Sequence, residues 1–478
     1  FAGDERVLMV STFQHPLYPY SGTHDPAPNM VNVPLPEGTG SQEFRDAVRE
    51  HWLPALLAFR PQLLLVSAGF DAHREDPLAG LQLGDADYAW APDSKSMVFA
   101  ARIAGRTEPW STNFDLYLAT VDGSEAPVNL TAANPATDAG PLYSPDGRTL
   151  YYRAMQRPGF EADRFQIRAL DLASRNARDI AADWDRSPEG LVVAPDGRTL
   201  YTTVADLGAG SLFAVDVASG KRTRLDNRGT VAGVTVGRDA IVYGRDDLKS
   251  TAQLYRLSPR GGEPVALTRF NAARMAGLAL GDYEQFTFAG WNGETVHAYL
   301  VKPANFSAGA KYPVAFLIHG GPQGSFGNHF HYRWNPQTYA GQGYAAVMVD
   351  FHGSTGYGQA FTDSISGDWG GKPMEDLQKG LAAALAKYDF LDGDRVCALG
   401  GSYGGYMANW IAGNWNEPFR CLVSHSGVFD NRMMAYSTEE LWFDEWEFQG
   451  KPWLKPDAYE RHNPVSHVGK WTKPLLVV

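Results

Sequence analysis

The sequence has few cysteines, more acidic than basic residues and no long apolar run. Its two cysteines, Cys397 and Cys421, lie in apolar stretches without the spacing of metal ligands, so we expect small core residues rather than a disulfide framework or a zinc knuckle. With 42 Lys and Arg against 54 Asp and Glu, the chain lacks the clustered cations that a nucleic-acid-binding surface needs. Because no apolar run approaches about 18 residues, we expect no membrane-spanning segment.

What the sequence does contain is typical of folded domains. Apolar residues make up 44% and charged residues 20% of the 478 residues, which leaves ample apolar surface to bury. A chain of this length exceeds one ordinary core, so we expect two or three domains. The pattern of apolar residues changes near residues 88 and 280, and we place the domain boundaries there.

Residues 1–88 have the pattern of an α/β fragment. Short apolar strands are predicted at Val7–Val10 and Leu63–Val66, and an amphipathic helix is predicted at Ser41–Leu57.

Residues 89–280 contain a repeat. A Pro-Asp turn followed by a β-rich run occurs three times, at Ala91–Lys95, Ser144–Arg148 and Ala194–Arg198, and Gly237–Tyr243 is a degenerate fourth copy. A turn of this kind once per about 50 residues is typical of β-propeller blades, so we predict a partial propeller of about four blades. The alternative is a set of unrelated hairpins that share a common turn.

Residues 281–478 alternate buried strands with helices, which predicts a parallel sheet covered on both faces. The predicted elements are strands Tyr312–Ile318, Tyr344–Val349, Arg395–Leu399, Arg420–Ser424 and Pro474–Val478, and helices Met374–Lys387 and Gly405–Gly413. Because the last strand ends with the chain, we expect the domain to continue beyond Val478.

Ser402 is the predicted nucleophile. Gly400-Gly-Ser402-Tyr-Gly404 fits G-x-S-x-G, follows a predicted strand and opens a predicted helix, which is the context of a nucleophile elbow. The glycines are needed because so tight a strand-to-helix turn leaves no room for side chains beside the serine.

The predicted oxyanion hole combines two segments. In an α/β-hydrolase one donor is the N–H of the residue after the nucleophile, here Tyr403, and the other comes from a Gly-rich loop after an early strand. His319-Gly-Gly-Pro322 follows such a strand, and we choose Gly321 as the second donor. We expect His319 to be structural. The alternative for this loop is a simple glycine turn.

The motifs of residues 281–478 resemble the catalytic domain of the prolyl oligopeptidase family of serine peptidases. The likeness is carried by His319–Pro322, Asp350–Gly358, Gly367–Gly370 with Asp376, and Gly400–Tyr406. Within that family, Ser424–Trp453 and Trp110–Tyr117 are most similar to the dipeptidyl peptidase V group.

The resemblance implies a mixed fold in which a β-propeller covers an α/β-hydrolase. It also implies cleavage of short peptide substrates through a Ser402 acyl-enzyme, without a cofactor, with dipeptides released from the N-terminus. An anion must then bind the α-ammonium group of the substrate, and we name Glu439 or Glu440 as the candidate. The alternative is an ordinary surface charge on a helix.

The other two members of a catalytic triad are missing from the expected places. His425, His462 and His467 follow Ser402, but the family places its acid and then its histidine after the strand Pro474–Val478. We therefore expect both partners beyond Val478 and predict little or no peptidase activity for the 478-residue chain. We expect His462 and His467 to be surface or packing residues.

Residues 1–88 resemble a different family, the histone deacetylases and acetylpolyamine amidohydrolases. Val7–Gly22, Ser67–His73 and Asp76–Leu78 carry this likeness. The family's position matching Asp71 is a zinc ligand, but the other ligands have no match, so we expect no bound metal and a capped turn at Asp71 and His73. The join near Tyr88–Ala91 suggests a fusion of two gene fragments.

Two other functions remain as alternatives to the peptidase. One is a non-catalytic module whose propeller binds a peptide or a partner, with Ser402 idle. The other is the remnant of a zinc-dependent deacetylase.

Overall fold

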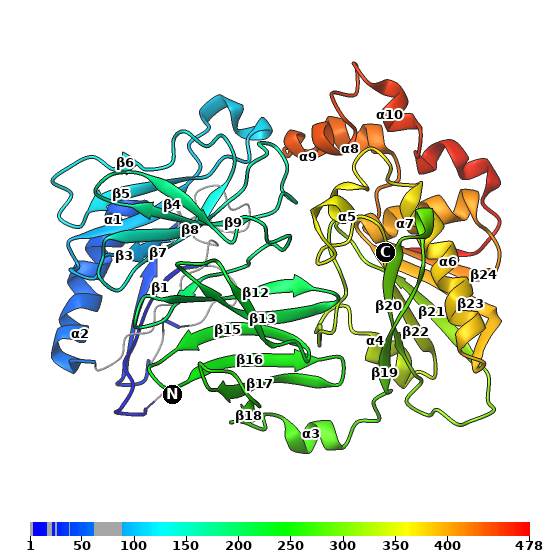
Figure 1. Cartoon of the computed structure of the whole chain (residues 1–478), viewed down its shortest axis with the longest axis horizontal. Helices are drawn as coiled ribbons and strands as arrows, with labels where there is room; N and C mark the ends of the chain where they lie inside the picture. Colours follow the sequence, from blue (N-terminus) through cyan, green and yellow to red (C-terminus); the bar gives the residue numbers. More distant parts are fainter. Residues whose placement is uncertain (1–2, 17–21, 24–25, 38, 62–87) are drawn as a thin grey trace. The chain divides into compact units, whose positions relative to one another are not determined.

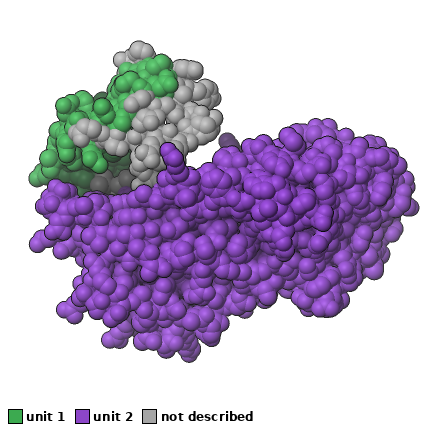
Figure 2. Space-filling model, turned by 90° about the horizontal axis from the view of Figure 1, so that it is seen from above, with its two compact units in different colours: residues 1–87 green, residues 88–478 purple. Residues whose placement is uncertain are grey.

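The computed structural model describes residues 3–16, 22–23, 26–37, 39–61 and 88–478. It divides into two compact units, Phe1–Asp87 and Tyr88–Val478 (Figure 2). Among the described helices, none combines the length and the apolar character that crossing a membrane requires.

The first unit pairs two parallel strands and carries one helical stretch. Strand β1 (Met9–Gln14) pairs with β2 (Met30–Leu35). The helical stretch consists of α1 (Ser41–Ala47), the π-helical turn η1 (Val48–Trp52) and α2 (Leu53–Phe59), which confirms the predicted helix. The predicted strand Leu63–Val66 lies outside the described residues, as do Asp71 and His73.

The second unit begins with a run of antiparallel sheets (Figure 1). The first two sheets have four strands each, and the next two groups of four are joined into one eight-stranded sheet by a parallel contact between β13 and β15. The strands of the first two sheets are β3 (Tyr88–Trp90), β4 (Ser96–Ala101), β5 (Asp115–Thr120) and β6 (Val128–Asn129), then β7 (Asp138–Tyr143), β8 (Thr149–Ala154), β9 (Gln166–Asp171) and β10 (Ala177–Ile180). The eight-stranded sheet contains β11 (Val192–Val193), β12 (Thr199–Asp206), β13 (Ala209–Asp216), β14 (Arg222–Asp226), β15 (Thr230–Val236), β16 (Ile241–Asp247), β17 (Ser250–Leu257) and β18 (Val265–Ala266).

The three predicted turns have the same local structure. In the second copy Gly147 N donates to Ser144 O (2.9 Å), and the Asp146 carboxylate accepts from the N–H two residues later. The copies at Ala91–Lys95 and Ala194–Arg198 make the same two bonds. The repeated motif therefore specifies one turn geometry, and the strand after each turn lies where the motif predicts it.

Successive sheets stack on one another through these turns and through apolar clusters. A Cβ placed on Gly147 would lie 3.4 Å from Pro92 of the preceding turn, and one on Gly197 would lie 3.5 Å from Pro145. Two apolar clusters combine buried residues of neighbouring sheets, such as Val98 and Leu150 in the first, and a third cluster joins the two halves of the eight-stranded sheet. This is the stacking expected of propeller blades. The described strands do not close a ring.

The rest of the second unit is built on a seven-stranded sheet of order β19-β20-β22-β21-β23-β24-β25 (Figure 1). The strands from β22 to β25 are parallel, as predicted, whereas β19 and β20 add an antiparallel edge. The strands are β19 (Tyr283–Ala289), β20 (Thr295–Val301), β21 (Tyr312–Ile318), β22 (Ala345–Asp350), β23 (Leu391–Gly401), β24 (Phe419–His425) and β25 (Leu475–Val477).

Both faces of this sheet are buried, which explains why its central strands are apolar throughout. One face packs against α6 and α7 in the largest apolar cluster, and the other packs against α4. The helices of the second unit are α3 (Ala272–Ala276), α4 (Pro336–Gly341), α5 (Gln359–Asp363), α6 (Lys372–Lys387), α7 (Tyr403–Asn414), α8 (Asn431–Ser437), α9 (Leu441–Glu447) and α10 (Pro456–Glu460), with 3-10 turns η3 (Gly105–Trp110), η4 (Trp291–Gly293) and η5 (Pro464–Lys470).

The prediction that the two cysteines are unpaired core residues is wrong. Cys397 on β23 and Cys421 on β24 are directly opposite one another in the parallel register, with Cα atoms 4.8 Å apart, and they form a disulfide. Their separation of 24 residues spans a whole strand–helix–strand unit, so the sequence spacing does not reveal that they meet.

Helix α9 buries a carboxyl group without a partner. Asp444 is 1% exposed, and neither of its carboxyl oxygens accepts a hydrogen bond from the described residues. Burial, together with the neighbouring charges of Glu447, Glu440 and Glu445, raises the pKa of Asp444 to about 7. An isolated charge at this position would be costly, so the carboxyl group holds its proton more tightly in the folded state than in the unfolded state.

We predict that Asp444→Asn stabilises the protein at pH 8 much more than at pH 4.5. Because the pKa of Asp444 is raised in the folded state, the free energy of unfolding falls as the pH rises from about 4 to about 7. The asparagine side chain does not ionise, so the variant avoids this loss of stability, which is on the order of 2 kcal/mol. The measurement is the melting temperature at both pH values, with Asp457→Asn as a control at an exposed carboxylate of the same charge. An equal gain at both pH values would contradict this explanation.

Candidate active site

Ser402 lies at a sharp turn between β23 and α7. Its backbone has a φ of 55° and a ψ of −119°, a strained conformation for a residue with a side chain. Its N–H donates to His425 O (3.0 Å) at the end of β24, and the residue is exposed. The strain therefore serves to hold the serine above the end of the sheet, as the elbow motif predicts.

The glycines of the motif are required by contacts between backbones. A Cβ on Gly404 would overlap the carbonyl oxygen of Ile318, at the end of β21. A Cβ on Gly405 would lie 2.6 Å from Gly427 Cα. No side chain fits at these two positions. Glycine therefore lets the start of α7 approach the ends of β21 and β24 more closely than a residue with a Cβ would.

The loop after β21 lies directly beside Ser402. A Cβ on Gly320 would be 3.3 Å from Ser402 Cβ, so the two backbones are in contact. Gly321 follows with a φ of 136°, which only glycine adopts readily. Within the described part of the chain, the N–H groups of Gly321 and Tyr403 have no hydrogen-bond acceptor. The two predicted oxyanion donors thus lie on the two segments that meet at Ser402.

His319 orients this loop from beneath. Its ring is 5% exposed, and burial lowers its pKa, so the imidazole is neutral. Its Nδ1 lies 2.8 Å from Gly320 O, which can only accept, so Nδ1 carries the proton and Nε2 accepts from Ser354 Oγ (2.8 Å). His319 is therefore bonded at both nitrogens and is not free to act on Ser402.

None of the three later histidines bonds the Ser402 side chain. His425 packs its ring against Trp334 at 5.1 Å, and His467 packs against Trp410 at 4.8 Å. His462 is partly buried, 3.9 Å from an Asp368 oxygen. Among the residues that the structure describes, Ser402 Oγ makes no hydrogen bond.

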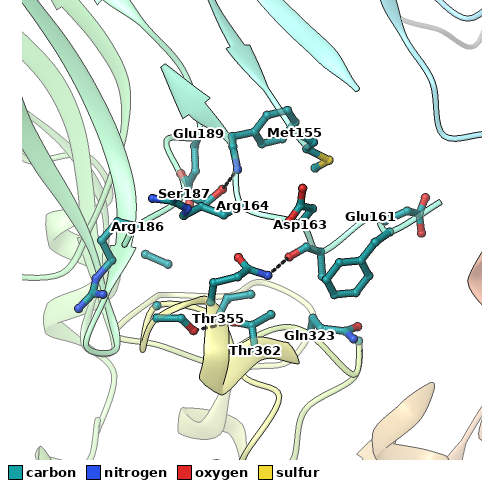
Figure 3. A pocket seen from close by; sticks show the side chains of 18 of the residues that line it. Met155, Glu161, Asp163, Arg164, Arg186, Ser187, Glu189, Gln323, Thr355 and Thr362 are labelled. Carbon is teal, nitrogen blue, oxygen red and sulfur yellow. Dashed lines mark hydrogen bonds between the residues drawn. The ribbon is translucent and has the colours of Figure 1, made fainter. Parts of the chain in front are cut away.

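Two cavities are lined by the neighbouring residues Gly320 and Gly321, one cavity by each. One, of about 320 Å³, is lined by Ser402, Gly320 and His425 together with apolar side chains from the end of the sheet. The other, of about 470 Å³, is lined by Gly321 and Gln323 and opens between the propeller sheets and the hydrolase sheet. Figure 3 shows Glu161, Asp163 and Arg186 on one side of this larger cavity and Gln323, Thr355 and Thr362 on the other. We call it the interdomain cavity.

A loop of the propeller is fastened across the interdomain cavity. Arg157 forms ion pairs with Asp163 in its own loop (2.6 Å) and with Asp363 of α5 (2.6 Å). Beside it the Phe160 ring stacks on Trp446 of α9, with centroids 4.4 Å apart. These contacts fix the walls of the cavity from both sides.

The predicted ammonium ligands Glu439 and Glu440 are not among the residues that line this cavity. Glu439 and Glu440 are exposed and precede α9, whereas Glu161 lines the cavity. Partial burial raises the pKa of Glu161, and the nearby charge of Glu440 raises it further. Glu161 is a residue that sequence reasoning missed, because nothing in its local sequence shows that its loop faces α9.

Buried polar groups behind the site were also missed. Glu447, Trp369 and Gln323 form a hydrogen-bonded group that the sequence shows only as scattered positions. Asp376, already part of the quoted motif, is 0% exposed and accepts from the N–H groups of Trp291 and His352.

Comparison with known families agrees with this geometry. Residues 330–478 match the model of the prolyl oligopeptidase family. Residues 1–106 match the histone deacetylase domain, a match that continues past residue 88 over β3 and β4.

Curated relatives are dipeptidyl peptidases of fungi. The probable dipeptidyl-peptidase 5 of Emericella nidulans is 35% identical over 415 residues, covering 83% of this chain and 57% of the relative. Dipeptidyl-peptidase 5 of Schizosaccharomyces pombe is 34% identical over 422 residues, covering 87% of this chain and 60% of the relative. The chain thus spans less than two thirds of the length of these relatives.

Solved structures share the fold. The acylaminoacyl peptidase of Pyrococcus horikoshii superposes with a TM-score of 0.69 at 23% identity, over 82% of this chain and 60% of that one. A puromycin-hydrolyzing peptidase of Mycobacterium tuberculosis superposes with a TM-score of 0.63 at 22% identity, over 84% and 61%. At these identities the likeness establishes the fold, a propeller with an α/β-hydrolase. Beyond its histone deacetylase-like N-terminus, the chain is similar to the prolyl oligopeptidase family, whose model its residues 330–478 match.

Proposed function

We propose that this chain carries the acyl-transfer site of a serine peptidase that cleaves short peptides. The observation that carries the proposal is the strained, exposed Ser402 beside two N–H groups, those of Gly321 and Tyr403, that have no acceptor in the described structure. We also propose residues 89–280 as the propeller domain and 281–478 as the peptidase domain, with 1–88 as a separate α/β fragment.

The geometry supports a two-step reaction. Ser402 Oγ attacks the carbonyl carbon of the scissile peptide bond, and the carbonyl oxygen becomes an anion that accepts from Gly321 N–H and Tyr403 N–H. The C–N bond then breaks, the amine leaves with the proton that Oγ gave up to a base, and an ester on Ser402 remains. Water hydrolyses the ester and restores the serine.

The proton acceptor for Ser402 is not among the described residues that contact it. His319 is bonded at both nitrogens, and the later histidines pack against tryptophans or lie near Asp368. Without a base the serine is a weak nucleophile, and only the binding and oxyanion contributions to catalysis remain.

We predict that the 478-residue chain hydrolyses a chromogenic dipeptidyl substrate at least about 10³-fold more slowly than dipeptidyl-peptidase 5 of Schizosaccharomyces pombe. The measurement is initial rate per mole of protein, with Ser402→Ala as the control for contaminating activity. Turnover close to that of the relative, abolished by Ser402→Ala, would show that the chain supplies its own base.

The substrate class that we propose is short peptides with a free N-terminus. The propeller loop held by Arg157 and the stacked Phe160 borders the interdomain cavity, and a cavity of about 470 Å³ suits a short peptide rather than a folded protein. Glu161 lines that cavity, and the charge of Glu440 is close enough to raise the pKa of Glu161. A bound ammonium group would relieve their repulsion. The curated relatives, named as dipeptidyl peptidases, support the same substrate class.

We predict that N-acetylation of a short peptide weakens its binding to the Ser402→Ala chain about tenfold or more. Replacing Glu440 or Glu161 by Gln should remove most of this difference, because each loses a charge that binds the ammonium group. The measurement is isothermal titration with the free and the acetylated peptide. Glu439→Gln tests the neighbouring candidate, and Glu375→Gln, on α6 beside Lys379, is the matched control. Equal affinities for both peptides would exclude an ammonium site.

A further inference from the structure

A chain of hydrogen bonds runs behind the active site from one predicted oxyanion segment to the other. Tyr403 Oη donates to Trp369 O (2.6 Å), and Trp369 Nε1 donates to Glu447 Oε2 (2.7 Å). On the other side, Gln323 Nε2 donates to Glu447 Oε1 (2.8 Å). Tyr403 follows the nucleophile and Gln323 lies two residues after Gly321, so the Glu447 carboxylate is the common point of both segments.

The surroundings of this chain make it rigid. Glu447 and Tyr403 are each 1% exposed, and Trp369 is 3% exposed, so water does not compete for the bonds among these three residues, whereas the bond from Gln323 is only partly buried. The Trp369 ring also packs edge-on against Tyr403, with centroids 5.3 Å apart. Glu447 is itself anchored, because its backbone oxygen accepts from Gly367 N (2.7 Å).

All the side-chain groups that contact the Glu447 carboxylate donate hydrogen bonds to it, and a carboxylate is suited to this position because it only accepts them. Besides Trp369 and Gln323, Ser366 Oγ donates to it (3.1 Å). Burial raises the pKa of Glu447 above its usual value, and these three donors offset only part of that rise. A glutamine of the same shape would turn an NH₂ group toward one of the donors, so one link of the chain would be lost.

We propose that Glu447 is a positioning residue of the oxyanion hole, whose carboxylate sets the distance between the Gly321 and Tyr403 N–H groups by holding Gln323 and Trp369 together. This inference rests on the proposed function. It predicts that loss of either link weakens binding of a tetrahedral oxyanion and leaves binding of a planar amide unchanged.

The experiment compares two ligands that share one side chain and one free N-terminus, a dipeptidyl boronic acid and the corresponding dipeptide amide. The serine hydroxyl releases its proton to the solvent as boron bonds to its oxygen and becomes tetrahedral, so the ratio of the two affinities reports the oxyanion hole without requiring turnover. Affinities are measured by isothermal titration, and boron NMR verifies the tetrahedral adduct. The parent chain should bind the boronic acid on the order of 10²-fold more tightly than the amide, and Ser402→Ala should abolish this preference.

Glu447→Gln should lower the preference for the boronic acid about tenfold or more, with amide affinity within about twofold of the parent. Ser366→Ala is the matched control, because it removes a bond to Glu447 that is not part of the chain between the segments, and its preference should stay within about twofold. Where Glu447→Gln fails to fold, Gln323→Met cuts the same link from the less buried end and should give the same loss.

The outcomes are distinct. An unchanged preference in folded Glu447→Gln or Gln323→Met would overturn the positioning role while leaving Ser402 as the nucleophile. An equal loss of amide and boronic acid binding would assign Glu447 a merely structural role. No preference in the parent chain, or one that survives Ser402→Ala, would overturn the proposed function and this inference with it.

Discussion

The site depends on the close approach of backbones at the ends of β21, β23 and β24. Gly404 and Gly405 leave no room for a Cβ against Ile318 and Gly427, and Gly320 touches the nucleophile in the same way. Since nothing separates these segments, N–H groups from two different strand ends can face one point. A single added methyl group would move them apart, and the strained conformation of Ser402 would lose the contacts that maintain it.

The loop that lies close to Ser402 is also held in place by side chains outside the strand ends. His319 holds the carbonyl of Gly320 from beneath the loop, and Glu447 holds Gln323 from the side of α9. Helix α9 in turn faces the propeller through the Phe160–Trp446 stack. The position of the oxyanion loop is therefore tied to the packing between the two halves of the second unit, which is also the packing that forms the interdomain cavity.

Much of the fold could be predicted from the sequence because its periodic signals are local. The strand Tyr312–Ile318 has the predicted bounds, and the repeated Pro-Asp turns identify the sheets that stack on one another. What the sequence could not show is which distant residues meet. Cys397 and Cys421 are paired by strand register alone, and Glu447 gains its importance from a fold that buries it against Trp369.

The central claim is that Ser402 and the N–H groups of Gly321 and Tyr403 together form a site for a tetrahedral intermediate. A crystal structure of the chain with a dipeptidyl boronic acid tests it most directly. The account predicts boron bonded to Ser402 Oγ, with one boronate oxygen roughly 2.7–3.1 Å from both nitrogens. Boron bonded elsewhere, or an adduct on Ser402 whose oxygens all face away from Gly321 and Tyr403, would contradict it.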